Sequence, residues 1–366
     1  MAPPDDKPGL EPPRTFRAVL PSIVTGLIVG ALGGLGARQI GLPLPYLLGP
    51  LVLCGIATLA GTIITPLPGG REMGQIVVGL AIGLRLLPEM LQTIIGLLPA
   101  MLLSTLGVVI VTMGTGLLLK RLTGIDRTTA YFATAPVGLA EMATLAHTRG
   151  GAADITSLVH TIRVAAIVTT VPLLVAWLGE DGGILPPRLP HRDQWSGLLL
   201  LILLAAGAAF ILKRWRVPNV WLLVPVTIGG IASATGLASL TMPPVLLIAA
   251  QLVIGIWLGR RFRRAMLTRL PRVTLAALLT TLLLLIAAAG GAVLLAAATT
   301  LPFATGFLSL APGGVTEMVL TASLLHLDVP VITAFHVTRI LLLTSFSLLL
   351  FHVFTMISRR IDGKDC

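Results

Sequence analysis

The chain has 366 residues, of which 55% are hydrophobic and only 11% are charged, and its mean hydropathy is +0.96. Long apolar runs of this kind exclude a water-soluble protein, and a transmembrane β-barrel would show short alternating segments instead. The net charge of +11 comes from basic residues in short loops between the apolar runs, which is typical of membrane orientation rather than of nucleic-acid binding. We therefore predict an all-α polytopic membrane protein that lies in the lipid bilayer and does not bind nucleic acid directly.

The N-terminal part predicts a tail followed by a first membrane span. Residues 1–15 are rich in proline and polar side chains, and we expect a disordered tail there. The apolar run at 16–37 is too long for a signal-peptide core and has no clear cleavage site, so it should remain as a span. Its Gly26, Gly30 and Gly34 have the spacing that lets helices approach closely, either within the chain or in a homodimer.

The rest of the first half predicts four more spans and one interrupted segment. Three spans are expected at 45–65, 73–87 and 89–119. Pro99 should kink the last of these. The segment at 127–148 has Pro136 and Gly138 in its middle, which predicts two half-helices around a break. A further span at 153–178 ends this half.

The second half repeats this order after a linker rich in proline, glycine and charge at 179–196. We therefore expect two membrane repeats, 16–178 and 197–357, and a C-terminal tail at 358–366. The second repeat should have spans at 197–212, 220–240, 243–259, 273–298 and 329–357, with its interrupted segment at 303–325.

Matched motifs show that the halves are an internal duplication. The sequence APVGLAEM at 135–142 recurs as APGGVTEM at 311–318, and each copy is followed at the same distance by H-x-x-R. The residues of these two H-x-x-R motifs are His160, Arg163, His336 and Arg339. A Q-x-x-x-G-x-x-x-G run also occurs twice, beginning at Gln75 and at Gln251.

Charge placement predicts the orientation of the repeats. If each interrupted segment is a re-entrant hairpin, each half crosses the membrane five times and the second half is inverted. With a cytoplasmic N-terminus, most of the 26 Lys and Arg residues then lie inside, as the positive-inside rule requires. Six crossings per half would instead place the basic cluster at 260–272 outside. We therefore predict two inverted five-crossing repeats, each with a re-entrant broken-helix hairpin, and cytoplasmic N- and C-termini.

The predicted site lies where the two hairpins meet near the midplane. Half-helix N-termini favour anions, and ionisable residues in apolar spans are costly enough to be candidates for function. The candidate substrate- or ion-binding residues are Pro136, Gly138, Glu141, His160, Arg163, Pro312, Gly313, Gly314, Glu317, His336 and Arg339.

The ionisable candidates also have structural interpretations. Glu141 and Glu317 can bind a coupling cation or proton, or each can pair with a buried arginine of the H-x-x-R motifs. The two motif histidines can relay protons or bind substrate, or they can be hydrogen-bonded within the core. Neither the histidines nor the two cysteines have metal-ligand spacing, so we predict no metal, no cofactor and no enzymatic activity.

The paired motifs resemble the AbrB membrane-protein family over roughly residues 17–357. That family has been labelled both as an ammonia monooxygenase and as a regulator of gene expression, and its architecture is similar to that of cation–substrate symporters with inverted repeats. The scattered histidines do not support a redox metal centre, and no segment outside the spans is long enough for a DNA-recognition fold.

These observations predict a secondary transporter-like protein of the cytoplasmic (inner) membrane. Its substrate would be a small solute coupled to a cation or proton, and the buried arginines favour an anion. The alternative is a membrane-embedded regulatory protein that affects gene expression indirectly, without transport.

Overall fold

The computed structural model describes residues 16–86, 88–179, 194–215, 217, 219–235, 240–262, 270–361 and 363. The predicted N-terminal tail and most of the predicted linker lie outside these residues. Within them, every regular element is a helix, which confirms the all-α class.

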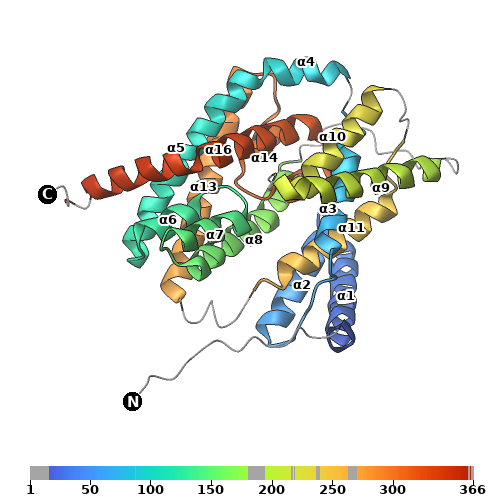
Figure 1. The fold of residues 1–366 in the computed structure, drawn as a ribbon, viewed down its shortest axis with the longest axis horizontal. Coiled ribbons are helices and arrows are strands. Elements are labelled where there is room, and N and C mark those ends of the chain that lie inside the picture. The colour runs from blue at the N-terminus through green and yellow to red at the C-terminus, as the bar shows by residue number, and fades with distance from the viewer. Residues whose placement is uncertain are drawn as a thin grey trace.

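The helices of the two halves follow the predicted order (Figure 1). The first half contains α1 (Phe16–Gln39), α2 (Pro45–Leu59), α3 (Gly70–Gly83), α4 (Pro88–Gly96), α5 (Leu98–Thr123), α6 (Arg127–Thr134), α7 (Leu139–Thr148) and α8 (Ala153–Leu178). The second half contains α9 (Gln194–Leu212), a 3₁₀ turn (Lys213–Trp215), α10 (Val220–Ala234), α11 (Pro244–Gly259), α13 (Pro271–Ala298), α14 (Phe303–Leu310), α15 (Val315–Leu324) and α16 (Val329–Ile361).

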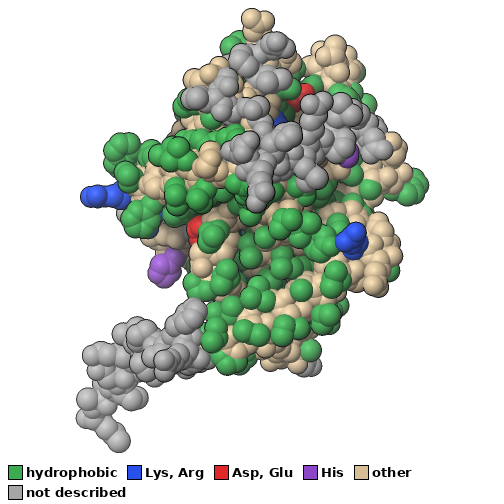
Figure 2. Space-filling model, turned by 90° about the vertical axis from the view of Figure 1, so that its right-hand side faces the viewer, with side chains coloured by type: hydrophobic (Ala, Val, Ile, Leu, Met, Phe, Trp, Pro, Cys, Tyr) green, Lys and Arg blue, Asp and Glu red, His purple; other side chains and the backbone are tan. Residues whose placement is uncertain are grey.

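Six of the described helices are long and apolar enough to cross a membrane: α1, α5, α8, α9, α13 and α16. Their outward faces carry large apolar side chains such as Leu103 and Leu294, which are 70% and 71% exposed and suit contact with lipid. Figure 2 shows hydrophobic side chains spread over one face, with few charged ones among them. The chain is therefore a multi-pass membrane protein.

Several boundaries differ from the prediction for local reasons. α2 ends at Leu59 because the chain then turns through Gly61, which has a positive φ. The expected kinked span at 89–119 is instead two helices, since Pro99 lies in the first turn of α5, a position that favours proline. At the other end of the chain, α16 continues to Ile361, into the stretch predicted to be a tail.

The shorter helices pack closely because of the repeated Q-x-x-x-G-x-x-x-G motif. A Cβ on Gly79 of α3 would lie 2.6 Å from the Leu222 carbonyl oxygen of α10. In the matching place, a Cβ on Gly255 of α11 would lie 2.5 Å from the Leu47 oxygen of α2. The second glycine of each motif makes a similarly close contact. Only glycine allows two helix backbones to approach in this way, so the motif acts in helix packing.

The glycines of α1 also contact their own chain. A Cβ on Gly30 would lie 2.6 Å from Ile256 of α11, and one on Gly34 would lie 2.8 Å from the Tyr46 ring of α2. Of the two interpretations of this glycine stripe, the structure therefore favours packing within the chain over a homodimer contact.

The helices group into two bundles, and each bundle draws on both halves of the sequence (Figure 1). One contains α1, α2 and α3 with α9, α10 and α11; the other contains α5 to α8 with α13 to α16. Contacts occur in matched pairs: α2 packs on α11 as α10 packs on α3, and α6 packs on α8 as α14 packs on α16. The two bundles meet mainly where α3 contacts α15 and α2 contacts α8, and the broken helices lie in the second bundle.

Candidate functional site

Both interrupted segments are broken at the predicted prolines, with the same backbone geometry. Ala135, the residue after α6, has φ −53 and ψ 128, and Ala311, the residue after α14, has φ −53 and ψ 127. The chain then passes through Pro136 or Pro312 before α7 or α15 begins. Each break leaves carbonyl groups at the end of one half-helix and N–H groups at the start of the next without helical partners.

The arginine of each H-x-x-R motif satisfies the carbonyl groups. Arg163 Nη1 donates to the Thr134 carbonyl oxygen at 2.7 Å, and its Nη2 donates to that of Ala135 at 3.3 Å. Arg339 Nη1 donates equivalently to Ala311 at 3.1 Å and to Leu310 at 3.3 Å. A guanidinium suits this position, because the C-terminal end of a helix carries partial negative charge.

The motif histidines hold these arginines in place. His160 Nδ1 lies 2.8 Å from Arg163 Nη2, and its Nε2 lies 2.9 Å from the Phe132 carbonyl oxygen. An arginine can only donate and a carbonyl can only accept, so Nδ1 accepts and Nε2 carries the proton. His336 repeats the arrangement with Arg339 at 2.7 Å. Both imidazoles are thus neutral and fully hydrogen-bonded, and this geometry matches the structural interpretation of the histidines.

The glutamates lie at the other side of each break. Glu141 and Glu317 are three residues after Gly138 and Gly314, the residues that precede α7 and α15. Each carboxylate folds back toward that glycine: a Cβ on Gly138 would lie 3.3 Å from Glu141 Oε2, and one on Gly314 only 1.8 Å from Glu317 Oε2. A carboxylate here faces the free N–H groups and the partial positive charge of a helix N-terminus.

The charged residues of each break therefore occupy opposite ends of it. Arg163 binds the carbonyls that end α6, whereas Glu141 lies at the start of α7. Among the described residues, neither glutamate forms an ion pair with Arg163 or Arg339. In place of the expected direct glutamate–arginine pair, the arginine caps the carbonyl end of each break and the glutamate lies beside the following helix start.

A single cavity of about 260 Å³ joins the two breaks. All the predicted site residues except His336 line it, although the two sets are far apart in the sequence. His336 supports Arg339 from behind the cavity wall. The structure thus brings both prolines, both glutamates and both motif arginines to one space, where α7 and α15 begin.

Further polar residues line this cavity that the sequence did not identify as a site. Arg71 at the start of α3 and Arg261 just after α11 contact the Trp257 ring, with guanidinium carbons 4.1 and 3.7 Å from its centroid. Burial, and next the neighbouring Arg71, lower the pKa of Arg261 to about 10. Gln75 Nε2 donates to Thr316 Oγ1 at 3.2 Å.

The additional lining residues could be predicted from the sequence only in part. The sequence assigned Arg71 and Arg261 only to cytoplasmic loops. Arg261 recurs as Arg85, two residues after the last glycine of the repeated Q-x-x-x-G-x-x-x-G run, but this repeat did not mark it as part of a site. Gln75 could have been found, since it begins the repeated Q-x-x-x-G-x-x-x-G run. The four arginines lining the cavity outnumber its two glutamates, so the cavity favours negative charge.

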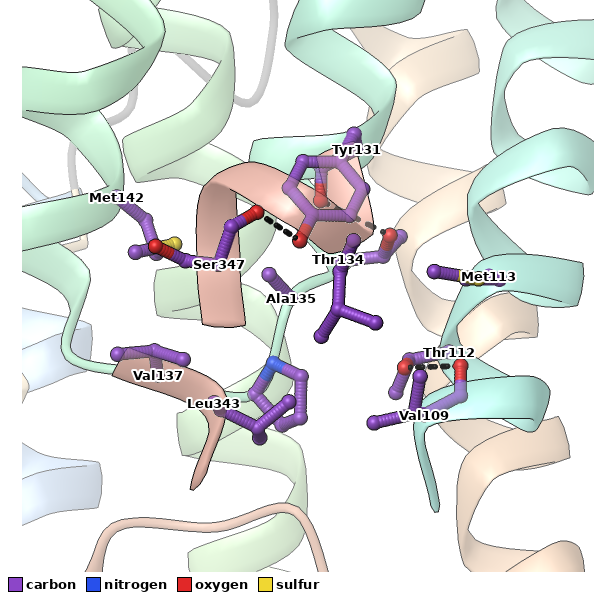
Figure 3. A pocket seen from close by; sticks show the side chains of 12 residues that line it. Val109, Thr112, Met113, Tyr131, Thr134, Ala135, Val137, Met142, Leu343 and Ser347 are labelled. Atoms are coloured by element: carbon purple, nitrogen blue, oxygen red, sulfur yellow. Dashed lines mark hydrogen bonds between the residues drawn. The ribbon is translucent and has the colours of Figure 1, made fainter. Parts of the chain in front are cut away.

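Two other cavities lack these charges. Figure 3 shows a small one of about 10 Å³ behind the first break, where Tyr131 donates to the Ser347 carbonyl oxygen at 2.9 Å. It has room for no more than one water. A larger cavity of about 770 Å³ lies between α5 and α13, and among its lining residues only Ser104 and Thr299 carry polar side chains. In the parts of the chain that the structure describes, no three His, Cys, Asp or Glu residues are grouped to hold a metal ion.

Comparisons with known proteins agree with the duplication. The sequence profile of a family described as "Transition state regulatory protein AbrB" matches the chain twice, at residues 2–151 and 64–355. The protein "Putative regulator AbrB" of Escherichia coli (strain K12) is 27% identical over 316 residues, covering 86% of this chain and 90% of that relative. "Uncharacterized protein YhjN" of Bacillus subtilis (strain 168) is 25% identical over 350 residues, covering 86% and 88%.

Proposed function

The chain belongs to the AbrB family, with two copies of its domain, and from that premise we propose that it is a secondary transporter. It moves a small anionic solute across the cytoplasmic (inner) membrane, coupled to a cation or a proton. It acts as a carrier rather than as an enzyme.

The proposed topology is two inverted repeats of five crossings, each with a re-entrant hairpin formed by α6–α7 or α14–α15. The matched helix contacts and the cytoplasmic excess of basic residues support it. In this topology Arg71, Arg261 and the segment around Asn219 all lie toward the cytoplasm, so the cavity opens inward. Cysteines at Arg214 and Met266 should then label from the cytoplasm, and a cysteine at Arg188 from outside; positions 188 and 266 lie outside the described residues.

The cavity shared by the two breaks is the observation that carries the proposal. Non-helical backbone at membrane depth is tolerated only where protein buries it or water lines it, and secondary transporters bind substrates at such broken helices. At each break an arginine binds the carbonyls on one side and a glutamate lies beside the helix start on the other. Alternating access requires two similar elements that are exposed in turn to the two sides of the membrane. Two separate breaks that face one cavity provide such a pair.

The glutamates are the proposed coupling groups. Glu141 and Glu317 line the cavity beside the partly positive N-termini of α7 and α15, where a carboxyl group can take up and release a proton or a cation. A proton or cation that binds such a carboxylate weakens its hold on the helix start. Coupling then operates through the position of α7 and α15, next to the bound solute.

A second candidate function is regulation of gene expression without transport. It is favoured by the printed names of the family and of the Escherichia coli relative, which both refer to regulation. Such a protein would act indirectly, through a partner at a cytoplasmic loop.

Uptake into proteoliposomes distinguishes the two functions. Purified protein should drive uptake of small radiolabelled anions, and imposed proton or sodium gradients should change the rate. Vesicles that contain a Glu141→Gln, Glu317→Gln double variant provide the matched control. Uptake equal to that of protein-free vesicles for every anion and gradient would refute transport and favour regulation.

A further inference from the structure

The two buried motif arginines each have one donor left over. Arg163 and Arg339 are both 3% exposed, and their Nη atoms are used on carbonyls and on histidines. Among the described residues, Nε of each arginine has no hydrogen-bond partner. Buried N–H groups without a partner are rare, because leaving one unsatisfied is costly. Both arginines line the cavity, and each unused Nε lies just behind its wall, with almost no exposed surface of its own.

The cavity also carries an unbalanced charge. Its four arginines face two glutamates, and each of those glutamates already serves a helix N-terminus. His160, the histidine in the wall, is neutral because Arg163 donates to it. Two positive charges therefore remain without a counter-charge in a partly enclosed space, where Coulomb interactions are stronger than in water.

From these donors and charges we infer that the cavity binds a small oxyanion with two negative charges. Each arginine turns slightly to uncover its buried Nε, and the anion's oxygens accept hydrogen bonds from Arg163 Nε and Arg339 Nε, one from each repeat. A dicarboxylate and hydrogen phosphate share this chemistry. The inference rests on the transport function proposed above and specifies its substrate class.

Arg71 and Arg261, which lie toward the cytoplasm in the proposed topology, form the outer part of the site. Trp257 holds the Arg71 and Arg261 guanidinium groups against its ring, which keeps two like charges close together. A guanidinium presents a planar fork of donors that matches a carboxylate or a phosphate. The anion therefore meets Arg71 and Arg261 first, and its second charge is matched by the deeper pair. Binding next to Trp257 should change the fluorescence of that ring.

Equilibrium binding to the purified full-length protein in nanodiscs tests the inference. Succinate and inorganic phosphate are titrated at constant ionic strength, with butyrate as a singly charged control, and read out by calorimetry and tryptophan fluorescence. At least one dianion should bind with a Kd roughly tenfold or more below that of butyrate. Tighter binding of succinate than of phosphate would identify the ligand as a dicarboxylate, and the reverse order would identify it as a phosphate.

Variants locate the binding. Arg163→Lys and Arg339→Lys keep the charge but remove Nε, and each should weaken dianion binding. Because they can also disturb the helix caps, Arg71→Gln serves as a second variant, with an expected increase in Kd of roughly tenfold. Arg85→Gln is the matched control, since Arg85 is the repeat counterpart of Arg261 but donates to Ser323 away from this cavity. It should leave the Kd unchanged.

The outcomes separate this inference from the transport proposal. Equal binding of butyrate and both dianions, or an Arg71→Gln Kd equal to that of Arg85→Gln, would overturn the dianion site. Dianion binding without uptake would support the site and contradict transport. Uptake of a neutral or cationic solute, with no dianion binding, would support transport and overturn the site.

Discussion

Replacing Gly314 by alanine should selectively release the Glu317 cap at the second break. The backbone there has φ −71 and ψ 141, which alanine adopts without strain. The added Cβ would lie 1.8 Å from Glu317 Oε2, and the next carboxylate atoms are also close. Because the carboxylate is the free end of a flexible side chain, it should move away while the backbone stays in place.

The expected effect on stability is small and can be worked out from two opposing contributions. Loss of a side-chain cap at a helix N-terminus destabilises by about 0.5–2 kcal/mol. Replacing glycine by alanine where φ allows it stabilises by about 0.4–1 kcal/mol through the unfolded chain. Gly314→Ala should therefore lower stability by at most about 1.5 kcal/mol, but it should strongly reduce uptake, because the freed Glu317 carboxylate enters the cavity.

Gly138→Ala is the matched control at the first break. Its Cβ would lie 3.3 Å from Glu141 Oε2, so the carboxylate need shift only slightly and the cap should persist. Thermal unfolding in detergent and proteoliposome uptake should be measured for both variants. Gly138→Ala should keep or raise the Tm and retain most uptake. If the two variants lost equal uptake, or Gly314→Ala had the higher Tm, the cap interpretation of Glu317 would be refuted.

Three other predictions follow from the same contacts. Glu141→Gln and Glu317→Gln should each abolish uptake at near-normal abundance in detergent extracts; parent-like uptake in both would exclude the carboxylates from coupling. Arg163→Ala should lower abundance, because each carbonyl left unpaired costs about 1–3 kcal/mol. Adding Glu141→Gln should not restore abundance; recovery in the double variant would indicate a direct ion pair between the two residues. Gln251→Met removes a buried oxygen that has no partner among the described residues, so the Tm should hold while Gln75→Met lowers it. When the transporter opens outward, the two repeats should exchange roles, so Gln251 should form the kind of hydrogen bond that Gln75 forms here. Gln251→Met should therefore still reduce uptake, and unchanged uptake would contradict this exchange.

The sequence predicted the positions of the helix breaks where residues are repeated. Pro136 and Pro312 lie at helix breaks, and the glutamates and motif arginines meet at one cavity, because duplication marks the same local structure twice. The break between α4 and α5 was not predicted, since Pro99 is compatible with both a kink and a new helix start.

Other features depend on tertiary packing and left little trace in the sequence. Arg163 reaches the end of α6 only because α8 packs on α6, so its carbonyl partners could not be inferred from spacing. Arg71 and Arg261 meet at Trp257 because α3 packs on α11. Their sequence positions fit ordinary membrane-orienting charges equally well, and the repeat of Arg261 as Arg85 marks no site, because only Arg261 lies at the cavity.

Side-specific cysteine labelling at the two breaks tests the central claim most directly. In a chain without its native cysteines, Gly138→Cys and Gly314→Cys should react with a small charged thiol reagent from the cytoplasmic side. Leu199→Cys, on an exposed apolar surface of α9, should not react because the reagent cannot enter the hydrocarbon. A transported anion should change the labelling rate at both breaks. If neither break reacts from either side, with or without anions, no aqueous cavity joins the two repeats and the transport account is contradicted.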